Sequence, residues 1–428
     1  MRVLNSVIWA IGLAAAVCVN ESAGAEYHVG LNGNDSAAGT EAAPWASIGA
    51  SLPKLKAGDT LTVLPGVYRG DVRLTRATVA STKEAPVVLR SKEPLKAVLE
   101  TGGNNAVAFD GECCYVKLDG FKITGGRDYG VFITGASHDI EVSNCEITKC
   151  AMGVKSARAS DLTFRKLNTH HNGYGMHLGD KGQNKAHRML IEDCTSDTDH
   201  KPGNTDGFCV EDGGSENLVF RRCVSSNNED AGFDVKPEAA VLENCVAFGN
   251  KEGFKCWRGA TLINCLAWGN KAWSVQTSGL NLGPEPKAVI LIHCTLVGAM
   301  DLAGPVQVLN SIVVGNIRHT PKGDKKLPDG KLIEDYNLLS GGAEARKSGE
   351  HSTAGDPAFV AAANHDYHLK PASPAAQKGT PSFPEVRARA SGGQTPVWDL
   401  VAVKTDLDGR KRTPDKAPDI GCFVQGKD

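Results

Sequence analysis

The stretch from Asn204 to Lys255 repeats one short pattern three times. It contains N-T-D-G-F-C-V at 204–210, N-N-E-D-A-G-F-D-V at 227–235 and N-K-E-G-F-K-C at 250–256. Each copy is a polar run followed by a Gly-Phe pair, one variable residue and an apolar or small residue. A repeat of about twenty to thirty residues with short β-type segments indicates a solenoid, in which each coil stacks on the preceding one.

Stacking predicts that residues at equivalent positions of the repeat become neighbours in space. The variable residue after each Gly-Phe pair is Cys209, then Asp234, then Lys255. Neighbouring strands of a sheet lie about 4.8 Å apart. We therefore expect these three side chains to form one column on the surface.

Cysteine usage supports the same interpretation. Six cysteines recur before strand-like runs, mostly after Asn, Asp or Arg, and Ser311 occupies the same place in a later copy: Cys145, Cys194, Cys223, Cys245, Cys265 and Cys294. Buried free cysteine behaves as a small apolar side chain. Because no CxxC spacing occurs, we predict an interior ladder of free cysteines in preference to disulfides or metal ligation.

The composition of the chain favours a turn-rich, all-β class. The 428 residues include 48 glycines, and periodic helical runs are scarce. One short amphipathic helix is expected over 45–55, where it would cover the open end of the solenoid. The net charge of −2 argues against a nucleic-acid-binding protein, which would usually carry a basic excess.

The first 25 residues have the pattern of a secretory signal. Arg2 precedes an apolar stretch over 7–19, and Ala23-Gly24-Ala25 supplies a cleavage site. We therefore predict a secreted protein, extracellular or periplasmic, with no membrane anchor. Residues 26–428 are predicted to form a single β-helix domain, with an N-terminal cap over 26–60, coils over 60–345 and a loop-rich tail over 346–428 that packs on the coils.

Four acidic residues fall in two successive copies of the repeat: Asp206, Glu229, Asp230 and Asp234. Crowded carboxylates repel one another unless a cation holds them together. Hard oxygen ligands without a cysteine ligand pattern favour Ca²⁺ over a transition metal. The alternative is that these acids cap turns, where Asp is common. Capping explains single residues better than it explains four acids on neighbouring coils.

Lys255 follows Asp234 in the predicted column and is a candidate base. A divalent cation and an apolar wall formed by Phe254 and Trp257 would both disfavour its ammonium and lower its pKa. A neutral amine can then accept a proton. The alternative is an ordinary salt bridge with Asp234, which would contribute little.

Several histidines and tryptophans are less informative. The histidines at 170, 171, 177, 187 and 200 cluster in sequence but lack ligand spacing, which favours structural or surface roles. Trp257, Trp268 and Trp273 suit stacking on sugar rings and aromatic packing on the flank of a solenoid equally well.

At these residues the chain resembles the family 9 polysaccharide lyases, which are secreted right-handed parallel β-helix enzymes that act on pectate. The segments N-T-D-G-F, N-E-D-A-G-F-D and G-F-K are similar to the family's calcium-site and catalytic-lysine segments. The resemblance implies that Asp206, Asp230 and Asp234 are calcium ligands and that Lys255 is the Brønsted base. It also implies a right-handed parallel β-helix.

The chain departs from the family's pattern at two places. Where the family has two adjacent aspartates, this chain has Asp230-Ala231, with Glu229 one place earlier as the candidate replacement ligand. The family's insertion between the last aspartate and the lysine is also longer, and Cys-Trp-Arg follows Lys255 here. Arg258, in this segment, is our candidate for gripping a substrate carboxylate.

The implied activity is Ca²⁺-dependent β-elimination on a uronic-acid polymer, with pectate or polygalacturonate as the first expectation. The expected partner is an acidic polysaccharide, and the expected state is a monomer that binds neither nucleic acid nor membrane. Two alternatives remain open at this point. One is a non-catalytic β-helix that binds glycans or serves as a surface protein. The other is a β-helix glycoside hydrolase, although the Gly-His-Gly and Arg-x-Lys motifs of polygalacturonases are missing from the corresponding region.

Overall fold

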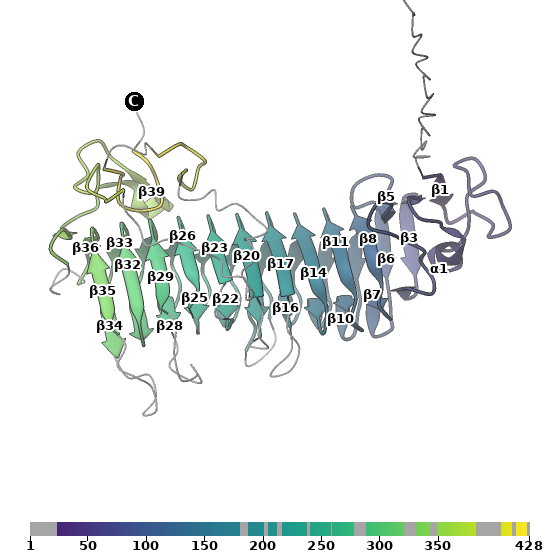
Figure 1. The fold of residues 1–428 in the computed structure, drawn as a ribbon, viewed down its shortest axis with the longest axis horizontal. Coiled ribbons are helices and arrows are strands. Elements are labelled where there is room, and N and C mark those ends of the chain that lie inside the picture. The colour runs from purple at the N-terminus through teal and green to yellow at the C-terminus, as the bar shows by residue number, and fades with distance from the viewer. Residues whose placement is uncertain are drawn as a thin grey trace, which may run out of the picture.

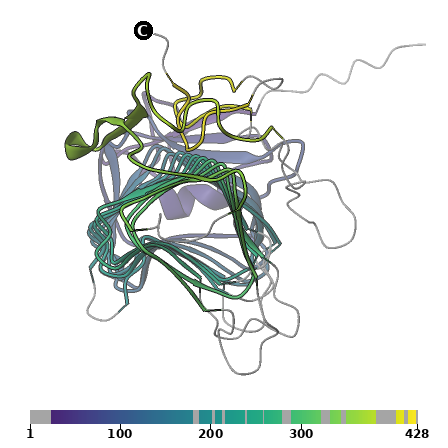
Figure 2. The same cartoon turned by 90° about the vertical axis from the view of Figure 1, so that its left-hand side faces the viewer.

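Each coil of the chain contributes three short strands, one to each of three long sheets that run the length of the molecule (Figures 1 and 2). The structure is a computed structural model that describes residues 24–179, 187–200, 204–211, 216–237, 240–257, 259–277, 288–320, 331–342, 349–381, 404–412 and 417–425. Residues 1–23 of the expected signal lie outside this set. Within it, no helix is long and apolar enough to cross a membrane.

All strand pairs of the three sheets are parallel and join successive coils. Sheet 1 contains β1 (Glu26–Val29), β2 (Thr60–Val63), β5 (Val87–Ser91), β8 (Cys114–Asp119), β11 (His138–Ser143), β14 (Ser160–Arg165), β17 (His187–Glu192), β20 (Glu216–Arg221), β23 (Ala240–Glu243), β26 (Thr261–Ile263), β29 (Val289–Ile292), β32 (Val306–Leu309) and β35 (Leu332–Asp335). Sheet 2 contains β4 (Val72–Thr75), β7 (Asn105–Asp110), β10 (Tyr129–Ile133), β13 (Met152–Ser156), β16 (Met176–Leu178), β19 (Phe208–Val210), β22 (Ala231–Val235), β25 (Glu252–Cys256), β28 (Trp273–Thr277), β31 (Met300–Ala303) and β34 (Ile317–Thr320). Sheet 3 contains β3 (Gly66–Arg69), β6 (Ala97–Glu100), β9 (Lys122–Thr124), β12 (Glu146–Thr148), β15 (Asn168–His170), β18 (Thr195–Asp197), β21 (Val224–Ser226), β24 (Val246–Phe248), β27 (Leu266–Trp268), β30 (Thr295–Val297), β33 (Ile312–Val314), β36 (Leu338–Ser340) and β37 (Thr353–Ala354).

The predicted all-β parallel β-helix with one short helix is confirmed. The helix α1 (Ile48–Ser51) continues into a 3₁₀ turn, η1 (Leu52–Lys54), at the N-terminal end of the coils. This is shorter than the expected 45–55. The reason is Pro53, which has no N–H to donate and lies inside the 3₁₀ turn. Outside the coils, β38 (Phe359–Ala361) and β39 (Asp366–Leu369) pair antiparallel around a 3₁₀ turn, η3 (Ala362–Asn364).

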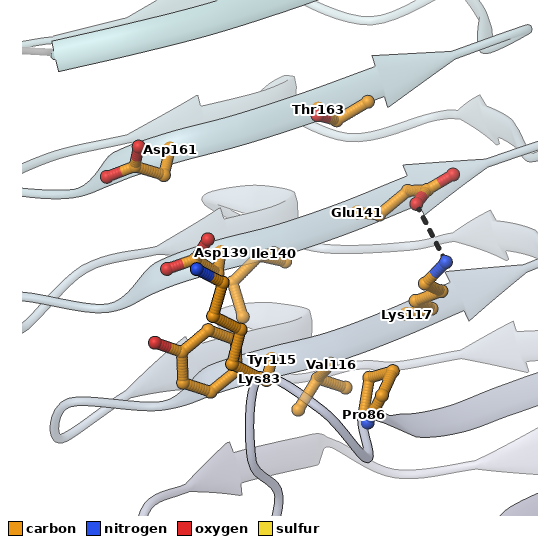
Figure 3. Close-up of a pocket in the computed structure, with 10 residues that line it drawn as sticks. All are labelled: Lys83, Pro86, Tyr115, Val116, Lys117, Asp139, Ile140, Glu141, Asp161 and Thr163. Atoms are coloured by element: carbon orange, nitrogen blue, oxygen red, sulfur yellow. Dashed lines mark ion pairs between the residues drawn. The ribbon is translucent and has the colours of Figure 1, made fainter. Parts of the chain in front are cut away.

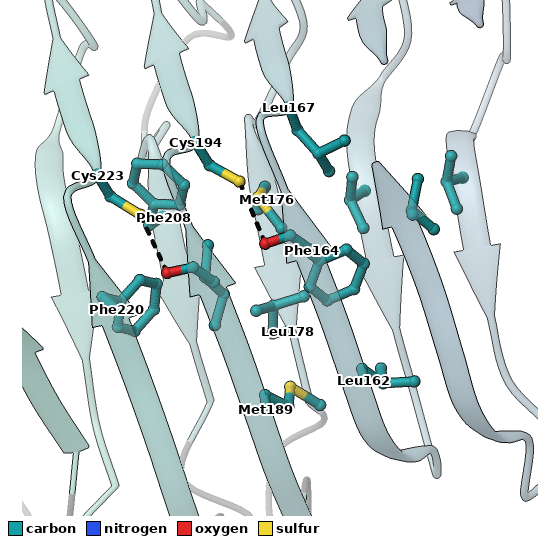
Figure 4. Close-up of a cluster of buried hydrophobic side chains, with 14 of the residues drawn as sticks. Leu162, Phe164, Leu167, Met176, Leu178, Met189, Cys194, Phe208, Phe220 and Cys223 are labelled. Carbon is teal, nitrogen blue, oxygen red and sulfur yellow. Dashed lines mark hydrogen bonds between the residues drawn. The ribbon is translucent and has the colours of Figure 1, made fainter. Parts of the chain in front are cut away.

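The cysteine ladder is also confirmed. All twelve cysteines of the described residues are buried and free of disulfides. The Cys194 thiol lies 3.6 Å from the carbonyl oxygen of Phe164, and the Cys223 thiol lies 3.3 Å from that of Ile191 (Figure 4). The residue before each of the six recurring cysteines has φ between +52° and +55°, as at Asn244, which suits Asn and Asp best. The repeated Asn-Cys pairs therefore mark a tight turn followed by an inward side chain.

The Gly-Phe pair of the repeat also has a packing role. The rings of Phe208, Phe233 and Phe254 stack inside the coils with centroids 5.0 Å apart. A Cβ added to Gly232 would lie 2.8 Å from both the side-chain nitrogen of Asn250 and the carbonyl oxygen of Gly253. Glycine is required because neighbouring coils approach too closely there for a side chain.

A ladder of polar side chains, all buried except the half-buried Asn270, runs beside these glycines. Its members are Asn172, Asp199, Asn228, Asn250 and Asn270. The side-chain oxygen of each member from Asp199 onward accepts the backbone N–H of the preceding member at 2.8 to 3.2 Å. The ladder satisfies backbone donors at the turn between sheets 3 and 2 and fixes the spacing of the coils.

The C-terminal segment folds back over the outer face of sheet 3 (Figure 2). Leu369, Ala375 and Ile420 pack on Ile312 and Leu338, while a second group around Tyr367 and Phe423 packs against Leu266 and Trp268. The buried Arg412 donates to the side-chain oxygen of Asn264 at 2.9 Å. Trp268 is stacked on Phe248 and packed beside this segment, as the aromatic-packing interpretation predicts.

Candidate functional site

Sheet 2 holds the predicted column of variable residues. Its register aligns Cys209 of β19 with Asp234 of β22, and Asp234 with Lys255 of β25. One coil earlier, His177 of β16 aligns with Cys209. The prediction that Cys209, Asp234 and Lys255 lie on neighbouring strands of one column is therefore confirmed.

Asp206 lies two residues before the start of β19 and is fully buried. Its Oδ1 accepts the backbone N–H of Ala231 at 3.0 Å, whereas its buried Oδ2 has no hydrogen-bond partner among the described residues. Burial, followed by the charges of Asp234 and Asp230, raises the pKa of Asp206 to about 8. The site thus disfavours the Asp206 anion, and a positive charge close to Oδ2 would favour it.

The other two aspartates have cationic neighbours. Lys251 Nζ lies 2.9 Å from Asp230 Oδ1, and Lys255 Nζ lies 3.4 Å from Asp230 Oδ2. Asp234 accepts a hydrogen bond from the indole N–H of Trp257 on Oδ1 and contacts Lys236 Nζ at 3.0 Å on Oδ2. Trp257 is therefore held in the site by a polar contact.

Lys255 is largely buried, with 16% of its side chain exposed. Burial disfavours the ammonium, but the charges of Asp234, Asp230 and Asp206 outweigh burial and raise the pKa of Lys255. The lowered pKa expected from sequence includes the charge of a bound divalent cation, so it stays a prediction for the cation-bound protein. The Trp257 ring of the expected apolar wall lies 5.7 Å from Nζ.

One candidate residue, Glu229, is not brought into this cluster. Glu229 is exposed on the turn before β22, in contrast to the buried Asp230 and Asp234. Arg258 lies outside the described residues. The structure therefore brings together Asp206, Asp230, Asp234 and Lys255.

The acidic residues fit a hard divalent cation. Ligand atoms of Asp206, Cys209 and Asp234 lie within 4.8 Å of one another. Burial and the neighbouring acids raise the pKa of the Cys209 thiol, so it remains protonated and is a poor ligand for a hard ion. The unpaired Asp206 Oδ2, together with Asp230 and Asp234, supplies carboxylate oxygens of the type that Ca²⁺ binds. The hydrogen bond to Asp206 Oδ1 comes from Ala231, 25 residues away in the next coil, so it joins two coils and does not cap a turn.

Sequence reasoning missed three residues beside the column. His177 Nε2 lies 3.1 Å from Glu211 Oε1, and Lys236 Nζ lies 3.4 Å from the same oxygen. Burial would raise the pKa of Glu211, but the hydrogen bond from His177 and the charge of Lys236 outweigh it and hold that pKa at about 2. One signal was the fragment G-M-H-L at 175–178, which places His177 at the variable position of an earlier copy. Another was the repeat itself, which places Glu211 and Lys236 at the same position after Val210 and Val235.

A separate hollow of about 290 Å³ lies on sheet 1 (Figure 3). Its lining mixes both signs of charge and includes Tyr115, Asp139 and Asp161, and Lys117 pairs with Glu141 at 3.3 Å. The lining has two lysines and three carboxylates, and the hollow lies on a different sheet from the acidic column. The column on sheet 2 is therefore the stronger candidate site.

A protein-family model described as Pel9A-like, right handed beta helix region, matches residues 27–295. The chain belongs to this family. The matched range includes the three buried aspartates and Lys255, and it establishes the coil as right-handed.

Two curated relatives of this Pel9A-like chain are named as pectate lyases. Pectate lyase PEL9 of Emericella nidulans is 26% identical over 265 residues, covering 54% of this chain and 58% of that protein. Pectate lyase L of Dickeya dadantii is 24% identical over 241 residues, covering 54% and 52%. The matches thus span little more than half the length of these curated relatives.

Solved structures confirm the fold. The crystal structure of pectate lyase Pel9A matches with a TM-score of 0.55 at 14% identity, covering 95% of this chain and 97% of that one. A GH136 lacto-N-biosidase from Eubacterium ramulus matches with a TM-score of 0.54 at 15% identity, covering 74% and 68%. Because these two proteins are named for different activities, the shared fold does not by itself decide the reaction.

Proposed function

We propose that this protein is a polysaccharide lyase that cleaves a uronic-acid polymer, pectate or polygalacturonate first, by Ca²⁺-dependent β-elimination. The observation that carries the proposal is the position of Lys255 on sheet 2, where its amine lies 3.4 Å from Asp230 and one strand from Asp234. Membership of the Pel9A-like family and the names of the curated relatives support it.

Asp206, Asp230 and Asp234 would hold the ion. Calcium bound there would neutralise the substrate carboxylate and acidify the proton on the adjacent carbon. The lone pair of Lys255 Nζ takes that proton from C5, the electrons form the C4–C5 double bond, and the C4–O4 bond breaks. The leaving oxygen takes a proton from solvent, so no water molecule is consumed in the cleavage.

The ionisation of Lys255 sets the pH dependence of this step. A base must be unprotonated, and the surrounding acids raise the pKa of Lys255 above its ordinary value. The fraction of free amine therefore grows as pH rises, and we propose an alkaline optimum.

The remaining parts of the proposal concern the setting of the enzyme. We propose that it acts outside the cytoplasm, extracellularly or in the periplasm, as a monomer on an acidic polysaccharide. Nucleic acid and membranes are not proposed as partners. Arg258 is proposed to bind a substrate carboxylate.

The deciding experiment is ultraviolet absorbance of the protein with polygalacturonate at alkaline pH, with Ca²⁺ and then with a chelator. We expect absorbance from the unsaturated product to rise only with Ca²⁺. Lys255→Ala should lower kcat by about 10²- to 10⁴-fold because it removes the base. The control is Lys251→Ala, which removes a lysine from the same Asp230 but on the exposed rim, and it should retain most of the activity.

Two other results would redirect the assignment. New reducing ends without absorbance would indicate hydrolysis. If the protein produces neither absorbance nor reducing ends from any uronate polymer but still binds glycans, the non-catalytic alternative is favoured.

A further inference from the structure

The acidic cluster already contains a further cation supplied by the chain itself, Lys236. Lys236 Nζ lies 3.0 Å from Asp234 Oδ2, 3.4 Å from Glu211 Oε1 and 3.5 Å from Cys209 Sγ. Only 16% of its side chain is exposed. The ammonium therefore faces two buried carboxylates and little water.

Two contacts hold Lys236 in this place: a hydrogen bond from its own backbone and the nearby indole ring of Trp257. The residue follows β22 directly, and its backbone N–H donates to the carbonyl oxygen of Val210 at 3.1 Å. Its Nζ lies 6.0 Å from the centroid of the Trp257 ring, whose N–H binds the other oxygen of Asp234. Both oxygens of Asp234 are thus engaged by the protein's own donors.

We propose that Lys236 is a resident counter-ion that competes with a divalent cation for Asp234, an inference that rests on the proposed function. A cation that binds Asp234 Oδ2 must displace the ammonium from a contact of 3.0 Å. Lys236 weakens divalent-cation binding, and occupancy of the site is set by exchange between the two cations.

Glu211 makes this exchange feasible. A buried ammonium left without a partner would be strongly destabilising. Glu211 is 5% exposed, and its Oε1 already lies 3.4 Å from Lys236 Nζ and 3.1 Å from His177 Nε2. When Asp234 binds a metal ion, Lys236 remains paired with the carboxylate of Glu211.

The other lysines of the cluster differ in position. Lys255 contacts Asp230 at 3.4 Å, and Lys251 contacts Asp230 at 2.9 Å and Glu252 at 3.3 Å. Lys251 is 54% exposed, so solvent screens its charge. It provides a matched control, because its removal deletes the same charge from the same cluster.

The test is calorimetric titration with Ca²⁺ of the wild type, Lys236→Met and Lys251→Met, each stripped with chelator and held at low ionic strength. Methionine keeps the length of the side chain and removes its charge. We expect Lys236→Met to lower the Kd for Ca²⁺ by about tenfold or more, because a buried charge at close range is weakly screened. Lys251→Met should change it by less than about fivefold.

Each outcome decides the inference. An unchanged or higher Kd in Lys236→Met, equal tightening in both variants, or no binding by Lys236→Met would overturn it. If the wild type binds Ca²⁺ and Lys236→Met binds it with the same Kd, this inference fails but the proposed function remains intact. Absence of binding in all three proteins, with cleavage insensitive to chelator, would also remove calcium from the proposed function. If Lys236→Met does not fold, Lys236→Gln, which can still donate to Asp234, replaces it.

Discussion

Gly232 illustrates how one residue of the repeat is constrained by its neighbours. Its position has room for a hydrogen but not for a methyl group, since a Cβ would contact Asn250 Nδ2 and the Gly253 carbonyl at 2.8 Å. Neither neighbour can move freely, because Asn250 belongs to the polar ladder and Gly253 to the next strand. The repeated glycine is therefore a requirement of stacking and not of backbone conformation.

Gly232→Ala is expected to destabilise the protein by about 1–3 kcal/mol, the usual cost of overpacking. Differential scanning calorimetry should show a lower Tm. The control is Gly49→Ala in α1, where nothing lies within 4 Å of the added Cβ and alanine favours the helix, so its Tm should be unchanged or higher. Equal Tm values for wild type and Gly232→Ala would contradict the packing argument.

The polar ladder shows how an element spanning several coils depends on the charge of one member. Asp199 stands where the adjoining coils have asparagine, and it is fully buried. Burial raises the pKa of Asp199 to about 6. The protonated form resembles asparagine, so the folded state favours it. The favourable contribution of protonated Asp199 to the free energy of unfolding is fully present below its ordinary pKa of 3.8. It is lost as pH rises through about 6.

Asp199→Asn should therefore stabilise the protein at pH 7 by about 1–3 kcal/mol, since it removes a buried charge while keeping an acceptor oxygen. The difference in Tm from wild type should shrink toward zero as pH falls to 4. The reverse change in the next coil, Asn228→Asp, should lower the Tm at pH 7. This Tm should rise again toward the wild-type value on acidification. A difference in Tm that does not vary with pH would show that Asp199 is not the titrating group.

At the scale of the whole molecule, the solenoid carries its site and its C-terminal segment on different faces. The acidic column lies on sheet 2, and the C-terminal segment covers sheet 3 at Leu266, Ile312 and Leu338. Without this cover, an apolar surface on successive coils would meet water, and such surfaces promote association.

Ending the chain after Gly355 should therefore cause self-association. We expect light scattering to show oligomers and the dye ANS to bind, because Trp268 and the apolar residues around it become exposed. Full-length protein at the same concentration is the control. A monodisperse truncated monomer without ANS binding would show that the C-terminal segment does not protect this face.

The sequence by itself determined the features that repeat with the coil. Coil length and the alternation of inward and outward residues fix the register, so the sequence predicted the column of Cys209, Asp234 and Lys255 and the free cysteine ladder. Stacking between neighbouring coils is nearly local, and a periodic sequence therefore encodes it directly.

Only the tertiary structure decided features that depend on side-chain direction or long-range contact. Glu211 and Lys236 occupy the same position of the repeat, directly after the aligned Val210 and Val235, but the direction of their side chains and their shared contact are decided only in the folded coils. The raised pKa of Lys255 depends on three carboxylates converging in a buried volume, and Glu229 turned out to face solvent. The contact between Asn264 and Thr405 joins residues 141 positions apart. No period connects such residues, because their contacts depend on how the completed coils pack.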